Sequence, residues 1–583
     1  MADAWKNSRI LIIAAALMTG LGQILGMALM RMREGMPVND GAYPASLVLQ
    51  FIIYSLAAGF LVFALCLLIR KVDLTAAAEG KEIPERTALA ERPAGWLTGL
   101  FIFLCWLPCW IAYFPAIYSY DGEPQLIQYT TGAFDNHHPV FHTLIMGWCY
   151  DLGQWITKLL PGESYLDGMA VYALIQSLFL ILAYTRVIRL AKLLGAGKIF
   201  STMLILWFAL FPVHPLMAIT TTKDTMYTAA LVLFLCALSE ILFSVGNRLS
   251  LLEFALSGIL MMLFRKNGLY LIGGLLLVLA SFLMAELTAQ QNPVSYKNKR
   301  RIYCLLAAMC IGSIALASLA ENVMIRATGA VQGESAEALS IPLQQLSRAY
   351  KSNTDDFTME ELETIAEYES LVGLNNYRPF ISDAVKQGFN NEHFREDPAG
   401  FFKLWFRYGL KYPGPYVMAF LYHTMGAWYP EDISHTLVYE DWWRDRTGYL
   451  ITDAIPVFAQ RYVIKENFWP SCRDFYEKIA TECAYRSIPL LRSLFSPYLY
   501  CAGTVLLVLA CITGGKKERR NKRAVLLVAV PLFVHYLMIL AGPCVIARYI
   551  FPLMAALPVA LIAACYGYRY NPGMIREKGN PST

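Results

Sequence analysis

Acidic residues and histidines gather in one loop, which gives this loop the side chains needed for acid–base chemistry. Asp121 comes directly after Tyr120, at the end of an apolar run near residues 95–115. A carboxylate held just above a bilayer can act as a general base by accepting the proton of an attacking hydroxyl. Apolar surroundings would raise its pKa toward the useful range. We therefore predict that Asp121 is the base. The other titratable candidates in the loop are Glu123, Asp135, His137, His138 and His142.

Two of these histidines have the spacing of a metal site. His138 and His142 are four residues apart and would share one face of a helix. Together with Asp121 or Asp135 they could bind a divalent cation such as Mg²⁺ or Mn²⁺, because imidazole and carboxylate are both suitable ligands. The alternative is that the histidines hydrogen-bond the substrate or the loop. The sequence leaves both open.

Three cations stand on the side of the membrane where few positive charges are expected, which indicates an anionic ligand. A lipid phosphate would give each of them a partner, and the planar fork of arginine suits phosphate. The cations and the neighbours expected to bind with them are Lys223 with Asp224, Arg265 with Asn267, and Arg548 with Tyr549.

Three of these residues also have a purely structural explanation. Asp224 stands at a helix start, where a carboxylate caps free backbone N–H groups. Arg265 could extend its stem along apolar surface toward the headgroups. Arg548 could pair with an acidic residue on the outer side. The sequence does not decide between these roles and phosphate binding.

A further segment, residues 339–348, opens a long polar region and reads as an extended piece turning into a helix. Gln344 and Gln345 could face a sugar, whereas the alternative is an ordinary amphipathic helix. Cys472 and Cys483 lie in the same polar region. A disulfide between them and two free thiols are both open.

Long apolar runs must position these groups. The 583 residues are 57% hydrophobic and 16% charged, and the charges cluster between the runs, as a bilayer demands. No basic stripe interleaved with aromatic residues is present, so we expect no nucleic acid partner. We predict an all-α integral membrane bundle with about twelve transmembrane helices, at residues 10–30, 46–69, 95–115, 166–185, 199–219, 225–245, 249–264, 268–285, 303–320, 496–513, 524–541 and 547–566.

The positive charges in short loops set the orientation of this bundle. Clusters near residues 186–198, 297–301 and 516–523 fall on one side when twelve spans are assumed, so both termini are expected in the cytoplasm. This requires residues 140–156 to lie at the outer interface rather than to span. Residues 401–429 likewise suit a headgroup-level helix or a re-entrant element. The expected parts are a membrane core at 1–320 with an outer loop at 115–165, an extracytoplasmic region at 321–495, further spans at 496–567 and a cytoplasmic tail at 568–583.

A span ending in Tyr120–Asp121, followed by an amphipathic stretch and then by His138–Pro139 entering another helix, resembles the GT-C superfamily. These are polytopic glycosyltransferases that use sugars linked to polyprenyl phosphate. The resemblance implies that Asp121 is the base, that His138 lies beside it and that the loop at residues 220–224 lines the site. One departure is that the loop follows the third span here, whereas in many members it follows the first.

The sequence therefore predicts an inverting glycosyltransferase in a bacterial plasma membrane. Its partners would be a polyprenyl-phosphate sugar donor, an outer glycan or lipid-linked acceptor, and membrane lipid. The rival class is a multi-pass transporter or flippase. Against it, the chain shows no two-half symmetry and few ionisable residues within its spans.

Overall fold

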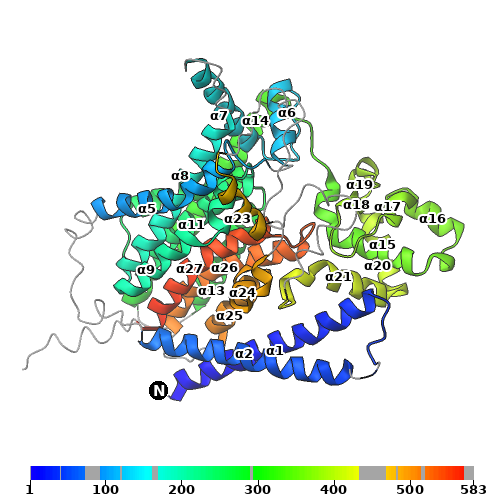
Figure 1. Ribbon diagram of the computed structural model, residues 1–583, viewed down its shortest axis with the longest axis horizontal. Coiled ribbons are helices and arrows are strands. Elements are labelled where there is room, and N and C mark those ends of the chain that lie inside the picture. Colours follow the sequence, from blue (N-terminus) through cyan, green and yellow to red (C-terminus); the bar gives the residue numbers. More distant parts are fainter. Residues whose placement is uncertain are drawn as a thin grey trace, which may run out of the picture.

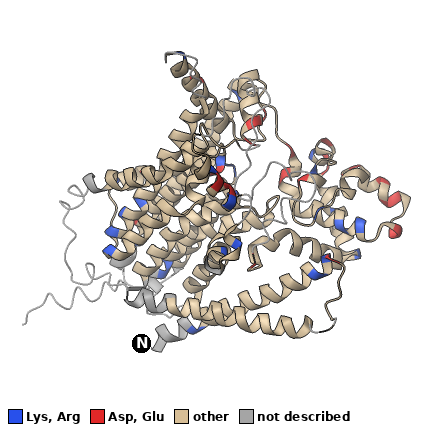
Figure 2. Ribbon diagram, in the orientation of Figure 1, with Lys and Arg blue, Asp and Glu red and all other residues tan. Residues whose placement is uncertain are grey.

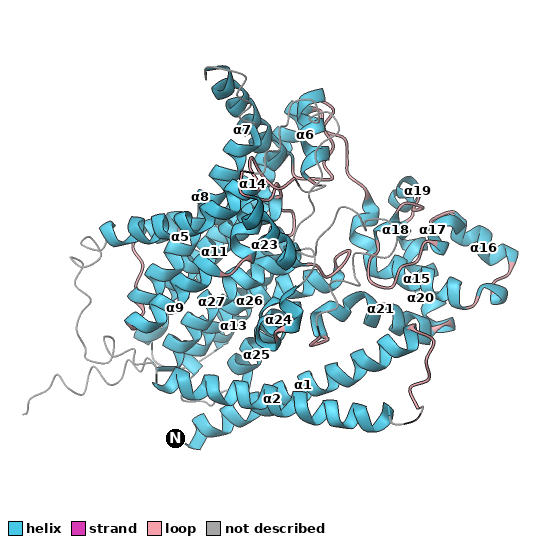
Figure 3. Cartoon of the chain, viewed as in Figure 1, coloured by secondary structure: helices cyan, strands magenta, loops and turns pink. Residues whose placement is uncertain are grey.

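The computed structural model describes an almost entirely helical protein. It covers residues 2–39, 41, 43–71, 92–118, 121–159, 168–288, 293–431, 468–480, 484–513 and 519–569, and within these ranges it contains no β-strand. Figure 1 shows a large helical bundle with a smaller group of short helices at one side, and Figure 3 shows that loops only connect the helices. The predicted all-α class is confirmed.

Nine helices in the described ranges are long and apolar enough to cross a membrane. Each coincides with a predicted span, because a run of about 20 apolar residues satisfies its backbone hydrogen bonds only as a helix. The nine are α1 (Ala2–Arg33), α2 (Tyr43–Lys71), α5 (Arg92–Ala112), α8 (Gly168–Leu193), α11 (Lys223–Leu242), α13 (Gly268–Thr288), α14 (Pro293–Thr328), α26 (Arg519–Ala541) and α27 (Ala547–Arg569).

The other three predicted spans are also helical, but they are shorter or broken. Residues 199–219 form α9 (Lys198–Leu210) and α10 (Val213–Ile219), which meet at an angle of 51°. The break falls at Pro212, which cannot donate a backbone hydrogen bond and therefore ends the first helix. The two remaining helices have 17 residues each: α12 (Arg248–Phe264) and α25 (Pro497–Thr513).

Helix α11 forms the centre of the bundle. It packs against α8, α12 and α27, and every residue from Asp224 to Ile241 is buried. A helix that is apolar on every side belongs in the interior of a bundle. Its first residue, Lys223, is therefore held inside the protein at one end of the bundle.

Two helices bring the polar loop to this end of the bundle. The short helix α6 (Gly122–Thr131) packs on α7 (Val140–Leu159), and α7 packs on α8. Helix α7 projects from the bundle (Figure 1), and its Trp148, Leu152 and Trp155 are exposed. It is not among the nine candidate spans, and its place at the interface stays a prediction.

The region after α14 folds around a core of its own. Helices α15 (Ser340–Ser352), α16 (Met359–Ala366), α17 (Leu371–Asn375), α18 (Asp383–Lys386), α19 (Asn391–Glu396) and α20 (Pro398–Lys411) form a group that we call the outer domain. Leu343, Ile365 and Phe401 are fully buried in its centre. Helix α14 continues to Thr328, so residues 321–328 of the predicted extracytoplasmic region form the end of this helix.

Helix α21 (Pro413–Trp428) connects the outer domain to the spans. The Tyr422 hydroxyl donates to the carbonyl oxygen of Leu29 in α1 at 2.7 Å, and the ring of Tyr429 covers Gly26. The chain thus runs back along the C-terminal part of α1. The stretch 401–429 forms two helices that turn at Tyr412–Pro413, and the second helix packs against α1, α25 and α26.

The predicted choice between a Cys472–Cys483 disulfide and two free thiols stays open. Cys472, in α23 (Pro470–Ala480), is a free thiol near the carbonyl oxygen of Pro108. Cys483 lies outside the described residues.

Candidate functional site

Two loops distant in sequence form the floor of the site. After α5 the chain runs alongside the loop before α11, where Ile117 pairs in parallel with Thr220. The Ile117 N–H donates to the oxygen of Ile219 at 3.0 Å, and the Thr221 N–H donates to the oxygen of Ile117 at 2.9 Å. This pairing brings Asp121, at the start of α6, next to Lys223, at the start of α11.

Gly122 permits this close approach. A Cβ atom at this position would lie 2.5 Å from the Oγ1 atom and 2.9 Å from the carbonyl oxygen of Thr221. Real Cβ atoms do not come so near, so only glycine fits without displacing the loop.

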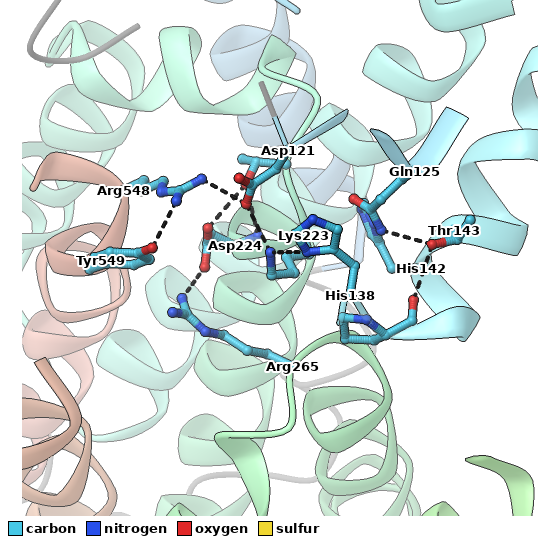
Figure 4. Close-up of polar contacts among 12 residues, drawn as sticks. Asp121, Gln125, His138, His142, Thr143, Lys223, Asp224, Arg265, Arg548 and Tyr549 are labelled. Carbon is cyan, nitrogen blue, oxygen red and sulfur yellow. Dashed lines mark hydrogen bonds and ion pairs between the residues drawn. The ribbon is translucent and has the colours of Figure 1, made fainter. Parts of the chain in front are cut away.

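Asp121 stands between two cations (Figure 4). Its Oδ2 atom lies 2.8 Å from the Nζ atom of Lys223 and 2.7 Å from the Nη1 atom of Arg548. Only 7% of Asp121 is exposed. The three residues come from the α6, α11 and α27 helices, so one carboxylate oxygen joins three separate elements. The ion pair that the sequence left as an alternative for Arg548 is present, and its partner is Asp121.

The expectation of a raised pKa for Asp121 is wrong. Burial, the largest single effect, does act to raise it, but the positive charges of Arg548 and Lys223 together hold the pKa of this carboxyl well below its usual value. The carboxylate is therefore ionised and firmly paired. It is a weak base for as long as both cations remain on it.

A second ion pair lies behind the first. Arg265 contacts the carboxylate of Asp224, which is fully buried. The guanidinium carbon of Arg265 is 4.8 Å from the centre of the Tyr549 ring, and that of Arg548 is 4.7 Å from the same centre. Arg548 also donates to the Tyr549 hydroxyl at 2.7 Å. Tyr549 thus positions both guanidinium groups by cation–π contact.

Asp224 does not cap α11 by itself. Thr222 is the N-cap residue, and its hydroxyl accepts from the backbone N–H of Asp224. The Thr222 hydroxyl also donates to the Asp224 carboxylate at 3.0 Å. The side chain of Asp224 is therefore available to hold Arg265. Figure 2 shows these opposite charges together in the middle of an otherwise uncharged part of the protein.

The two histidines have different roles. The Nζ atom of Lys223 donates to the Nδ1 atom of His138 at 3.0 Å, and burial lowers the pKa of His138 to about 2, so its ring is neutral. His142 instead lies in a buried chain, where it accepts from the side-chain amide of Gln125 at 2.9 Å and bonds to the hydroxyl of Tyr172 at 2.7 Å. His138 belongs to the site, whereas His142 holds α6, α7 and α8 together.

The metal site that the sequence left open, at Asp121, His138 and His142, is not assembled in the described part of the chain. Within the described ranges, no three His, Cys, Asp or Glu side chains are placed to hold a metal ion. Asp135 accepts from the Gln128 amide at 2.7 Å and from the His137 N–H at 2.9 Å. Its carboxylate therefore fixes the turn before α7.

Several predicted residues lie outside the ion-pair cluster. Gln344 donates to the oxygen of Arg378 at 2.7 Å, and Gln345 accepts from the indole of Trp405 at 3.0 Å. Both glutamines therefore serve the interior of the outer domain, in line with the structural alternative. Glu123 is half-buried in the first turn of α6, His137 is exposed beside His138, Asn267 is half-buried in the turn before α13, and Tyr120 lies outside the described residues.

The residues that hold the loop before α11 were not predicted from the sequence. Gln176 donates to the oxygen of Ala218 at 2.9 Å and to that of Thr220 at 2.7 Å, and it accepts from Tyr172. Both side chains lie within the span α8. A glutamine and a tyrosine one turn apart in an otherwise apolar run were the signal for this role.

The outer domain and α21 hold the loop that leads to Arg548. The Ser382 N–H donates to the oxygen of Pro543 at 2.9 Å. The His423 ring contacts the oxygen of Gly542 at 2.7 Å through its Nε2 atom. The loop 542–546 is thus fixed between the outer domain and the bundle, and it leads directly into α27.

Comparison with known proteins gives a family but no activity. Neither the curated proteins nor the solved structures yield a match to the chain. A family of unknown function, DUF6020, matches residues 127–577. The match covers Lys223, Arg265 and Arg548 and begins just after Asp121. The chain belongs to the DUF6020 family.

Proposed function

We propose that this protein is a membrane glycosyltransferase that transfers a sugar from a polyprenyl-phosphate donor to an acceptor outside the cytoplasm. The observation that carries the proposal is the convergence of Lys223 and Arg548 on a single carboxylate oxygen of Asp121. Two cations 2.8 and 2.7 Å from one anionic oxygen form a site that a phosphate oxygen would also fit. The proposal places this site at the outer face of a bacterial plasma membrane, with both termini in the cytoplasm.

In the proposed reaction, the donor phosphate takes the place of the Asp121 carboxylate on Lys223 and Arg548. The carboxylate is then separated from its cations, and its pKa rises toward the ordinary range. It can accept the proton of the acceptor hydroxyl as that oxygen attacks the anomeric carbon. The bond between the anomeric carbon and the phosphate oxygen breaks with inversion, and the lipid phosphate leaves with its negative charge on the two cations.

The other residues of the cluster would support this arrangement. Tyr549 orients Arg548. Asp224 neutralises the charge of Arg265, so this second arginine does not compete with Lys223 and Arg548 for the phosphate. His138 is neutral and accepts from Lys223, so it directs the lysine ammonium toward the site. A glycan or lipid-linked acceptor would approach from the side of α6.

The test is sugar transfer by the full-length protein in lipid nanodiscs, with a panel of polyprenyl-monophosphate sugars as donors. We expect wild type and Asp151→Asn to transfer sugar and Asp121→Asn to lose transfer. Asp151 is a suitable control because it is an exposed carboxylate bonded to Tyr129 at 2.5 Å, away from the cations. Transfer that survives in Asp121→Asn would remove its role as base. If wild type instead moves the intact lipid across the membrane and leaves its sugar attached, the protein is a flippase.

A further inference from the structure

The helices α20 and α21 expose a row of large apolar side chains. Phe402, Phe406 and Leu410 stand four residues apart on α20 and are 44%, 60% and 70% exposed. Residues at this spacing share one face of a helix. Val417 and Phe420, 57% and 39% exposed, continue the strip onto α21. We call these five residues the apolar strip.

The strip is not the core-facing side of α20. That side consists of Phe401, Leu404 and Tyr408, which are buried in the outer domain. Helix α20 is therefore apolar on two faces, of which one stabilises the fold and the other is unused. An exposed apolar surface of this size marks a contact with a membrane or another molecule.

The packing of α21 on α1 fixes the level of the strip. Tyr422 bonds to Leu29, Tyr429 covers Gly26, and the carbonyl oxygen of Trp428 lies against Gly22. Helix α21 therefore runs antiparallel to α1, and the residues before Tyr422 lie toward the end of α1. That end carries Arg31 and Arg33 in its last turn, and such long cationic side chains reach the headgroups from the end of a span. Phe420 and Val417 thus lie near the headgroup level.

The charges around the strip indicate the kind of surface that it meets. From Pro398 to Pro430 the chain contains no Asp or Glu. Lys403 and Arg407 are exposed on α20 beside the strip, whereas Lys411 pairs with Glu361 at 2.9 Å. An apolar helix face flanked by exposed cations is typical of a helix lying in the interface of an anionic membrane.

We infer that the apolar strip docks the outer domain on the outer leaflet of the bilayer, with Lys403 and Arg407 on anionic phospholipid headgroups. The strip continues the contact of α21 with the spans α1 and α25. Docking would also fix the outer domain over the loop 542–546, which Ser382 and His423 hold. The inference is independent of the reaction at Asp121.

The test is photo-crosslinking of the full-length protein in nanodiscs. Phe406 is replaced with p-benzoylphenylalanine, a large aromatic residue, and Met359 is replaced in the same way as a control. Met359 is 73% exposed on α16, outside the strip. We expect lipid adducts at position 406, detected by mass spectrometry, to exceed those at position 359 at least several-fold. A nanodisc of mixed phosphatidylglycerol and phosphatidylcholine should give mainly phosphatidylglycerol adducts.

A second variant tests the role of the charges. Lys403→Glu with Arg407→Glu should retain the adducts at position 406 but abolish the preference for phosphatidylglycerol. Equal labelling at positions 406 and 359 would overturn the inference. Crosslinks from position 406 to a second copy of the chain, in place of lipid, would also overturn it and would identify the strip as a dimer interface.

Discussion

The Asp121 carboxylate occupies the place proposed for the donor phosphate, and this makes an unusual prediction. Replacing Asp121 with Asn removes the negative charge but keeps the shape of the side chain. Although the variant should lose transfer, we expect it to bind a lipid phosphate more tightly than wild type. The phosphate would no longer have to displace an internal anion from Lys223 and Arg548.

The size of the effect follows from the two contacts. One Asp121 oxygen lies 2.8 Å from Lys223 and 2.7 Å from Arg548. A hydrogen bond to a charged group contributes about 1.5–3 kcal/mol. Relief of even one such contact corresponds to roughly tenfold in affinity, since about 1.4 kcal/mol is a factor of ten. We expect the dissociation constant of polyprenyl monophosphate to fall at least about tenfold in Asp121→Asn.

Binding can be measured in nanodiscs by titration calorimetry, with unphosphorylated polyprenol and the Asp151→Asn variant as controls. Thermal unfolding of each variant without ligand shows whether it is folded. Removing one partner of a buried ion pair destabilises a protein, so a lower melting temperature is expected without ligand and should recover when phosphate binds. Unchanged or weaker phosphate binding by folded Asp121→Asn would refute competition between carboxylate and phosphate.

Three further predictions concern the supports of the site and the outer domain. Arg548→Lys keeps the charge but loses the hydrogen bond to the Tyr549 hydroxyl and the cation–π contact with its ring. The KM for the donor should therefore rise roughly tenfold, an effect of about 1–2 kcal/mol, with a smaller change in kcat. A KM equal to that of wild type would contradict this. Gly122→Ala would place a methyl group against Thr221 and push the two loops apart, at a cost of about 1–3 kcal/mol, so it should abolish transfer. In the control Gly414→Ala the added methyl group meets open space, and this variant should be active. Burial raises the pKa of Glu369 to about 8. The contribution of the neutral side chain to stability is therefore fully present below pH 4.5 and is lost as the pH rises through 8. Glu369→Gln should therefore protect the outer domain from hydrogen exchange at pH 8 more than wild type does, and a pH-independent difference would contradict the assignment.

Local features of the sequence were sufficient to predict most helices. The spans followed from apolar length alone, because a bilayer permits no other backbone structure for such runs. Pro212 marks the break between α9 and α10. Residues 199–219 are nevertheless predicted as one span, because the apolar run continues across the proline. Tyr172 and Gln176 are polar residues within an apolar run, and this pattern predicts buried hydrogen bonds of the kind that Gln176 makes to the loop before α11.

The sequence by itself determined which residue types stand at the ends of the spans: a carboxylate at Asp121 and cations at Lys223, Arg265 and Arg548. Only the tertiary structure decided how they pair, because each comes from a different helix and their distances depend on how α6, α11, α12 and α27 pack. That packing placed two cations on Asp121 and reversed the expected direction of its pKa shift. It also placed Gln344 inside the outer domain, since an amphipathic pattern shows which face of a helix is polar but not what that face meets.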